Sequence, residues 1–77
     1  MNKEQVHSEE FLKLVGQRIK ELRLKSGYTS YEAFALENEL DRKQYWRAEK
    51  GSNLTLKTLY TIAKIHDISM EELFRSL

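Results

Sequence analysis

Apolar residues recur at spacings of three and four along most of the chain, which is the spacing of one face of an α-helix. The first such stretch begins at Phe11, and Gly27 is a suitable C-terminal stop for it. The ten residues before Phe11 lack this periodicity, so we expect residues 1–10 to form a flexible N-terminal segment. The apolar face of the first helix is expected to consist of Phe11, Leu12, Val15, Ile19 and Leu22.

Two short helices are predicted in the middle of the chain from residues that cap helix N-termini. Thr29 and Glu32 form a capping box for the first of them, and Ser30 is the alternative N-cap. Asp41 is a good N-cap for the second. The residues expected to pack inward from this part of the chain are Ala33, Phe34, Leu36, Leu40, Tyr45 and Ala48.

Two further helices are predicted towards the end of the chain. Thr55 is the expected N-cap of one, and Ser69 with Glu72 forms a capping box for the other. Met70 and Leu77 are candidates for an interface with a partner subunit, because they lie at the edge of the last apolar stripe. The expected core residues of these helices are Leu56, Leu59, Tyr60, Ile62, Ala63, Ile65, Leu73 and Phe74.

Composition supports a single all-α domain over residues 11–77. The 77 residues include no proline and only three glycines, which argues against a turn-rich β fold. The absence of cysteine excludes disulfides and thiolate metal sites, and it fits a reducing cytoplasm. The longest apolar run, residues 33–36, is far too short for a signal peptide or a membrane span. We expect a cytoplasmic protein with no membrane partner.

The net charge of +1 does not by itself indicate a nucleic-acid-binding protein, so such a function must depend on where the charges lie. They concentrate in the helix expected over residues 41–50. At 100° per residue, four cations and one indole of this helix fall within an arc of about 140°. A charge run is usually a solvated face, but a tryptophan among the cations favours a contact surface. The five residues of the arc are Arg42, Lys43, Trp46, Arg47 and Lys50.

Other candidate chemistry is weak. His7 and His66 are too isolated to indicate a metal or catalysis, and we expect His66 to be half-buried or to cap a helix C-terminus. Adjacent carboxylates do not face each other on a helix, and no glycine-rich phosphate loop is present. We therefore expect no enzyme activity, no cofactor, no metal and no small-molecule ligand.

Four segments carry a resemblance: VGQRIKELRLKSG, TSYEAFA, LDRKQYWRAEKG and NLTLKTLYTIAKIHDISMEELF. Together, over residues 15–74, they resemble the lambda-repressor-like, Xre-type helix-turn-helix family of bacterial and phage regulators. The resemblance implies a compact five-helix domain whose helix-turn-helix covers about residues 30–50. Its two helices would be residues 30–38 and 41–50, and the second would be the recognition helix.

The resemblance also implies roles for individual residues. Arg23 and Glu49 would form a structural ion pair between the first and third helices. Base contacts are expected from Arg42, Lys43, Trp46 and Arg47, the outward-facing residues of the recognition helix. Contacts to DNA phosphates are expected from Ser30, Tyr31, Lys50, Asn53, Thr55 and Lys57.

Several positions depart from the family pattern: Tyr45 is bulkier than usual, one extra residue lies between Gly27 and Ala35, and three further positions bear on function. Tyr31 stands where the family usually has a phosphate-binding glutamine, although a tyrosine hydroxyl can also donate to a phosphate. Glu39 stands where a turn glycine is usual, so we expect Asn38 to adopt the positive φ in its place. Trp46 is bulkier than the usual residue, and its expected role is an apolar contact to a thymine methyl or the sugar backbone, with a dimer contact as the alternative.

The expected function is therefore a sequence-specific, double-stranded DNA-binding transcriptional regulator, repressor-like and associated with the nucleoid. Two copies would act as a homodimer on half-sites about one helical turn apart, since one module offers few base contacts. The alternative is an antitoxin-like or adaptor module of the same fold that binds another protein. The salt dependence of duplex binding distinguishes the two.

Overall fold

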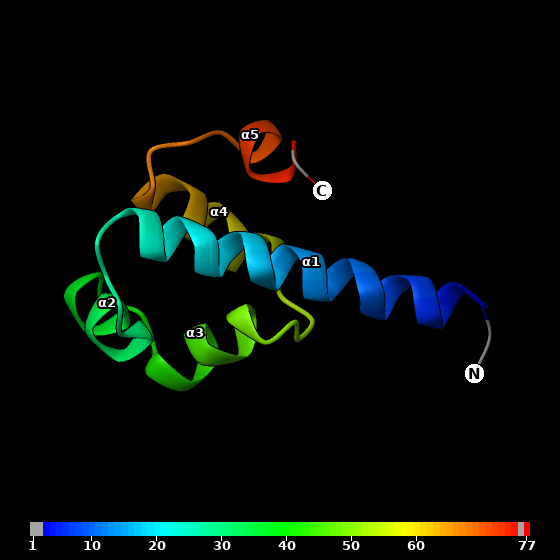
Figure 1. Cartoon of the computed structure of the whole chain (residues 1–77), viewed down its shortest axis with the longest axis horizontal. Helices are drawn as coiled ribbons and strands as arrows, with labels where there is room; N and C mark the ends of the chain where they lie inside the picture. The colour runs from blue at the N-terminus through cyan, green and yellow to red at the C-terminus, as the bar shows by residue number, and fades with distance from the viewer. Residues whose placement is uncertain (1–2, 76) are drawn as a thin grey trace.

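A computed structural model describes residues 3–75 and 77, with side chains placed for residues 8–75 and 77. Within these residues the chain forms five α-helices and no β-strand (Figure 1). The expected all-α class is therefore confirmed, while Met1 and Asn2 lie outside the described residues. The helices are α1 (Lys3–Lys25), α2 (Tyr31–Glu37), α3 (Arg42–Glu49), α4 (Leu56–Ile65) and α5 (Met70–Phe74).

Helix α1 begins eight residues before the expected start at Phe11, so that prediction is wrong. Residues 3–10 are rich in Glu, Gln and Lys, which have good helix propensity even without apolar periodicity. The N-terminal half of α1 extends beyond the other four helices (Figure 1). The flexibility expected for residues 1–10 stays a prediction.

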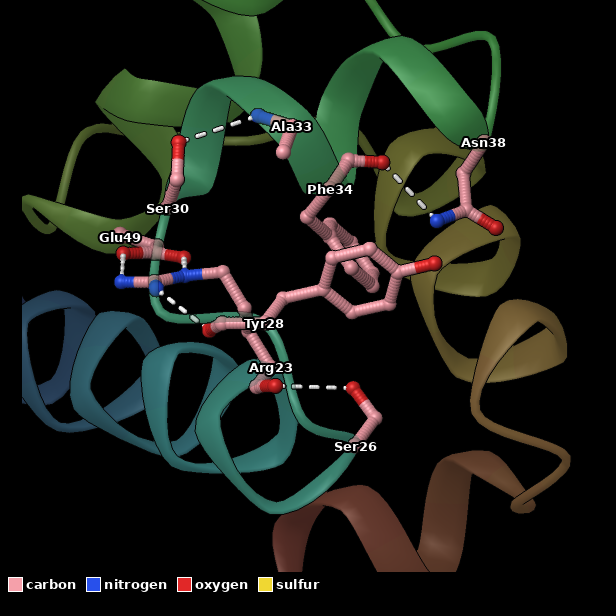
Figure 2. A network of polar contacts seen from close by, with 8 residues as sticks. All are labelled: Arg23, Ser26, Tyr28, Ser30, Ala33, Phe34, Asn38 and Glu49. Atoms are coloured by element: carbon pink, nitrogen blue, oxygen red, sulfur yellow. Dashed lines mark hydrogen bonds and ion pairs between the residues drawn. The ribbon is translucent and has the colours of Figure 1, made fainter.

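The N-termini of α2 to α5 are each capped by a side chain. Ser30 Oγ accepts a hydrogen bond from the Ala33 N–H at 3.1 Å, so Ser30 caps α2 and the expected cap at Thr29 is wrong (Figure 2). The other expected caps are confirmed, because each accepts a hydrogen bond from the N–H three residues on. These caps are Asp41 for α3, Thr55 for α4 and Ser69 for α5.

Helices α1 to α4 share one C-terminal geometry, in which the residue after the cap has positive φ. In α2 this residue is Glu39, with φ of 57°, whereas Asn38 has φ of −102°. The expectation that Asn38 would take the positive φ is therefore wrong. The Asn38 amide instead donates to the Phe34 carbonyl at 2.9 Å, and the Leu40 N–H donates to the Ala35 carbonyl at 2.8 Å. The Glu39 N–H also donates to the Leu36 carbonyl at 3.2 Å, and this bond together with that of the Leu40 N–H makes Glu39 the αL residue of a Schellman motif.

The other three helix ends have the same pattern. Gly27 after α1 and Gly51 after α3 have φ of 95° and 90°, which glycine adopts without strain. Gly27 therefore ends the first helix as expected. Asp67 after α4 has φ of 56°, so two of these four helix ends place an L-residue where glycine is more usual.

The core lies where α1, α2, α3 and α4 meet. The Phe34 ring is at its centre, with its centroid 5.1 Å from the Tyr45 ring and 5.2 Å from the Tyr28 ring. The expectations for Val15 and Ile19 are confirmed, since both side chains are buried. The buried apolar residues are Val15, Ile19, Phe34, Ala35, Tyr45, Ala48, Ile62, Ala63 and Leu73.

Five residues expected to pack inward are exposed. Two of them are Ala33 and Phe11, of which Phe11 is 49% exposed. Leu36 is 80% exposed, Leu56 73% and Tyr60 55%, so these predictions are wrong. The inward side of α4 runs through Ile62 and Ala63, which leaves Leu56 and Tyr60 on another side of the helix. The core is therefore small, and several large apolar side chains remain at the surface.

Candidate nucleic-acid interface

The outer side of α3 gathers cations and one indole. The inner side is held by Tyr45 and Ala48, which are both buried. The five residues of the expected arc are all exposed, so their placement opposite the packed side is confirmed. We call this surface the basic face, and it consists of Arg42, Lys43, Trp46, Arg47 and Lys50.

A close approach of α1 fixes the position of α3. A Cβ atom on Gly16 would lie 2.6 Å from the Glu49 carbonyl oxygen and 2.8 Å from that of Ala48. Any side chain at this position would collide with backbone, so only glycine allows the two helices to touch there. This role of Gly16 was not predicted from the sequence, although an isolated glycine within a helical pattern is a signal for close packing.

An ion pair ties the end of α1 to the last turn of α3 (Figure 2). Arg23 Nε lies 2.7 Å from Glu49 Oε2, and Arg23 Nη2 lies 3.0 Å from Glu49 Oε1. Arg23 Nη1 also donates to the Tyr28 carbonyl at 2.9 Å, and the side chains of the pair are only 5% and 6% exposed. The hydrogen bond to Glu49 raises the pKa of Arg23. The expected ion pair is confirmed in its geometry.

A tyrosine hydroxyl lies unpaired near this ion pair. Tyr45 Oη is buried and has no hydrogen-bond partner among the described residues. Burial raises the pKa of Tyr45, and the nearby Glu49 carboxylate adds to this effect. The phenol therefore stays neutral, and its contribution is the packing of its ring against Phe34.

Arg42 at the start of the basic face has a partner on α2. Its Nη1 lies 3.2 Å from Glu32 Oε2, and both side chains are more than half exposed. Exposed pairs of this kind contribute about 0–1 kcal/mol, so the pair can open at little cost. Tyr31 lines the same hollow as these two residues, and the full lining is Tyr31, Glu32, Arg42, Lys43 and Trp46.

Trp46 and Lys50 interact along the basic face. The Lys50 ammonium lies 5.8 Å from the centroid of the Trp46 ring, within the range of a cation–π contact. Trp46 is 44% exposed, so one part of the indole still faces solvent. The indole and the cations therefore form one continuous surface.

The expected phosphate-binding residues do not all lie together. Tyr31 is brought next to Arg42 and the basic face. Thr55 and Lys57, in contrast, line a hollow with the acidic residues Glu39 and Asp41. These carboxylates repel an anion. The electrostatic potential near Lys57 is therefore less favourable for phosphate binding than the sequence suggested. The Thr55 hydroxyl is in addition used as the α4 cap. Ser30 and Asn53 are exposed.

A second group of cations, not predicted from the sequence, lies on α1. Lys13, Gln17 and Lys20 line one hollow with Lys50 and Glu49. Their spacing of four and three residues places them on one side of a helix, so their grouping on α1 could have been predicted from the sequence. Because the Glu49 carboxylate is engaged with Arg23, this group extends the positive surface of α3 onto α1.

Comparisons of the chain with protein-family models, curated proteins and solved structures found no match. In the part of the chain that the structure describes, no group of three or more His, Cys, Asp or Glu side chains could hold a metal ion. No described helix is long and apolar enough to cross a membrane.

Proposed function

We propose that this chain is a sequence-specific, double-stranded DNA-binding regulator of the lambda-repressor-like, Xre-type helix-turn-helix family, acting as a homodimer. The observation that carries the proposal is the basic face of α3. Four cations and an indole point away from a helix whose opposite side is buried. A single helix displayed in this way fits the major groove of B-DNA, which is about 12 Å wide.

The arrangement around α3 supports contacts between the side chains of its first turn and the base edges of DNA. Arg42 and Lys43 are exposed next to the Asp41 cap, which keeps their backbone helical. From this position their side chains can donate to guanine O6 and N7. Arg47, one turn later, would read a base or bind the flanking phosphate. Trp46 would contact a thymine methyl group or the sugar backbone.

The pair between Arg42 and Glu32 implies an exchange of partners on binding. In the free protein the guanidinium is held by a carboxylate, and in the complex it would turn to a base or a phosphate. Removing the carboxylate frees the guanidinium in advance. Glu32→Ala should therefore bind duplex DNA as tightly as the wild type or more tightly, which a fluorescence titration can measure.

The alternative function is a protein-interaction module of the same fold. It is favoured by the net charge of +1 and by the acidic side chains of Glu32, Glu39 and Asp41 close to α3. These carboxylates lower the positive potential that draws a protein to DNA. A protein partner would then cover Trp46 and the surrounding cations.

Selection from random duplexes followed by salt titration tests the proposal. A DNA-binding protein should enrich a defined sequence, and the logarithm of its binding constant should fall linearly with the logarithm of salt concentration. The slope is about −0.9 for each phosphate neutralised. Failure to enrich any sequence, with binding too weak to titrate at 50 mM salt, would favour the interaction module.

A further inference from the structure

The indole of Trp46 is the one large apolar group on the basic face. Its exposed fraction is 44%, and the Lys50 ammonium lies over the ring, 5.8 Å from its centroid. Lys50 is the C-cap residue of α3, four positions after Trp46. Residues four apart lie on the same side of a helix, so the contact follows from the geometry of this last turn.

The surroundings of Lys50 favour this position of its ammonium. Lys50 lines a hollow with Lys13 and Lys20 of α1. The Glu49 carboxylate in the same hollow is already engaged in two hydrogen bonds with Arg23. Because like charges repel and the face of an indole attracts a cation, the Lys50 ammonium is stabilised over the ring.

Two further cations lie towards the start of α3. Trp46 lines a second hollow with Arg42 and Lys43, so the indole has cations before it and after it along the helix. On DNA these cations pair with phosphates and with polar atoms of the bases. The apolar ring between them needs a different partner. The one apolar group that a base pair presents in the major groove is the C5-methyl group of thymine.

We propose that Trp46 reads thymine through this methyl group, and that Lys50 positions the indole for the contact. The inference rests on the proposed function, because it assigns one of the base contacts of α3. It selects the methyl group over the sugar backbone as the partner of the indole. Lys50 acts through Trp46 and is therefore a positioning residue, in place of the phosphate contact expected from the sequence.

Positioning contributes to binding because a side chain that is already held loses less conformational entropy in the complex. A cation over an exposed ring changes an equilibrium by a factor of about two to five. Burial of one methyl group contributes a factor of about four. Both effects are large enough to measure by titration of duplex DNA.

Replacement of thymine by deoxyuridine tests the contact, because it removes the methyl group alone. Each thymine of a selected duplex is replaced in turn, and the binding constant is measured by fluorescence titration. At one position the wild type should bind about two- to fivefold more weakly, whereas Trp46→Ala should bind both duplexes equally. A preferred duplex that contains no thymine, or one in which no replacement weakens binding, overturns the inference.

Two substitutions test the positioning role of Lys50. Lys50→Arg keeps a cation for the indole and should retain the wild-type response to deoxyuridine. Lys50→Gln removes the charge and should reduce this response towards that of Trp46→Ala, and it should change nothing further in a Trp46→Ala background. If Lys50 binds phosphate instead, Lys50→Gln weakens both duplexes equally and lowers the salt slope by about 0.9, a result that overturns the positioning role.

The contact is also tested without DNA, by proton NMR. Protons over an aromatic ring resonate upfield, so the Lys50 side-chain signals should move downfield in Trp46→Ala. The signals of Lys64, an exposed lysine of α4, are the control and should not move. Lys50 signals that stay in place overturn the inference.

Failure of this inference differs from failure of the proposed function. Equal binding of the wild type to a selected and a scrambled duplex overturns the proposed function and the thymine contact with it. A sequence preference that does not respond to deoxyuridine overturns the thymine contact alone.

Discussion

Arg23 and Glu49 join the end of α1 to the last turn of α3 through two hydrogen bonds, of 2.7 and 3.0 Å, in a site with almost no solvent. Their separation in the sequence is 26 residues, so the pair closes a large part of the chain. The pair is buried, whereas the residues of the basic face are exposed. The orientation of α3 therefore depends on an interaction that DNA need not touch.

Removal of one partner of this pair should destabilise the fold strongly. Glu49→Ala leaves the Arg23 guanidinium buried without its carboxylate, which costs roughly 3–5 kcal/mol. The melting temperature should fall by more than about 10 °C, since each kcal/mol corresponds to roughly 4–8 °C in a domain of this size. Thermal unfolding followed by circular dichroism measures it. Glu32→Ala, which breaks only the exposed pair with Arg42, is the matched control and should change little. Equal melting temperatures for the two variants would contradict the structural role.

Gly16→Ala should also destabilise the protein. In an ordinary helix interior this change stabilises by about 1 kcal/mol. Here the new Cβ would meet the Glu49 and Ala48 carbonyl oxygens at 2.6 and 2.8 Å, and such overpacking costs roughly 1–3 kcal/mol. Gln17→Ala, at the neighbouring exposed position, should have almost no effect. A Gly16→Ala protein that melts at or above the wild-type temperature would show that α1 and α3 are not packed in this way.

Glu39→Gly should stabilise the protein, because a left-handed L-residue costs about 1–2 kcal/mol relative to glycine. Glycine loses part of this gain through its greater freedom when unfolded, so the expected gain is about 0.5–1 kcal/mol. Asn38→Gly should instead destabilise, since it removes the amide that donates to the Phe34 carbonyl. Urea unfolding of both variants and the wild type measures these changes in the free energy of unfolding. The reverse order of stabilities would assign the positive φ to Asn38.

Stability should depend on pH through His66. The ring stacks on Phe34 with centroids 5.3 Å apart, and its Nε2 is buried without a partner among the described residues. Burial lowers the pKa of His66 below 6.5, and the nearby Arg18 guanidinium lowers it further. The neutral ring therefore favours the folded state above pH 6.5. As the pH falls below 6.5, the unfolded chain binds a proton that the folded chain resists, and stability is lost.

His66→Gln isolates this contribution, because glutamine does not titrate. Urea unfolding at pH 7.5 and pH 5.5 should show a larger loss of stability for the wild type than for the variant. Carboxylates that begin to protonate near pH 5.5 affect both proteins alike. Equal losses in the two proteins would exclude His66 as the titrating group.

Much of the local structure could be predicted because it depends on neighbours in the sequence. The caps at Asp41, Thr55 and Ser69 follow from residue type and the apolar run behind each. The outward arc of α3 follows from the angle per residue alone, once Tyr45 and Ala48 are recognised as the packed side. The ion pair of Arg23 with Glu49 spans two helices and was expected only through the family resemblance.

The missed features depend on tertiary packing. Leu56 and Tyr60 have the spacing of core residues, but α4 packs inward through Ile62 and Ala63, so Leu56 and Tyr60 remain exposed. Gly16 acquires its role from the α3 carbonyls that approach it. The grouping of Lys13 with Lys50 likewise depends on how α1 crosses α3. Sequence patterns describe each helix but not the angle at which two helices meet.

The central claim is that α3 reads DNA sequence through its basic face. The most direct measurement compares wild type, Arg42→Ala and Trp46→Ala on a selected duplex and on a scrambled duplex, at two salt concentrations. Lys25→Ala, which removes an exposed cation at the end of α1, is the control for a loss of charge alone.

The wild type should prefer the selected duplex at both salt concentrations. Arg42→Ala should weaken binding to it by about 1–3 kcal/mol, and the preference at one base position should relax. Trp46→Ala should reduce the preference as well, whereas Lys25→Ala should weaken both duplexes by a similar small factor. Equal binding of the wild type to both duplexes, with a ratio that neither α3 substitution changes, would contradict the claim that α3 is a sequence reader.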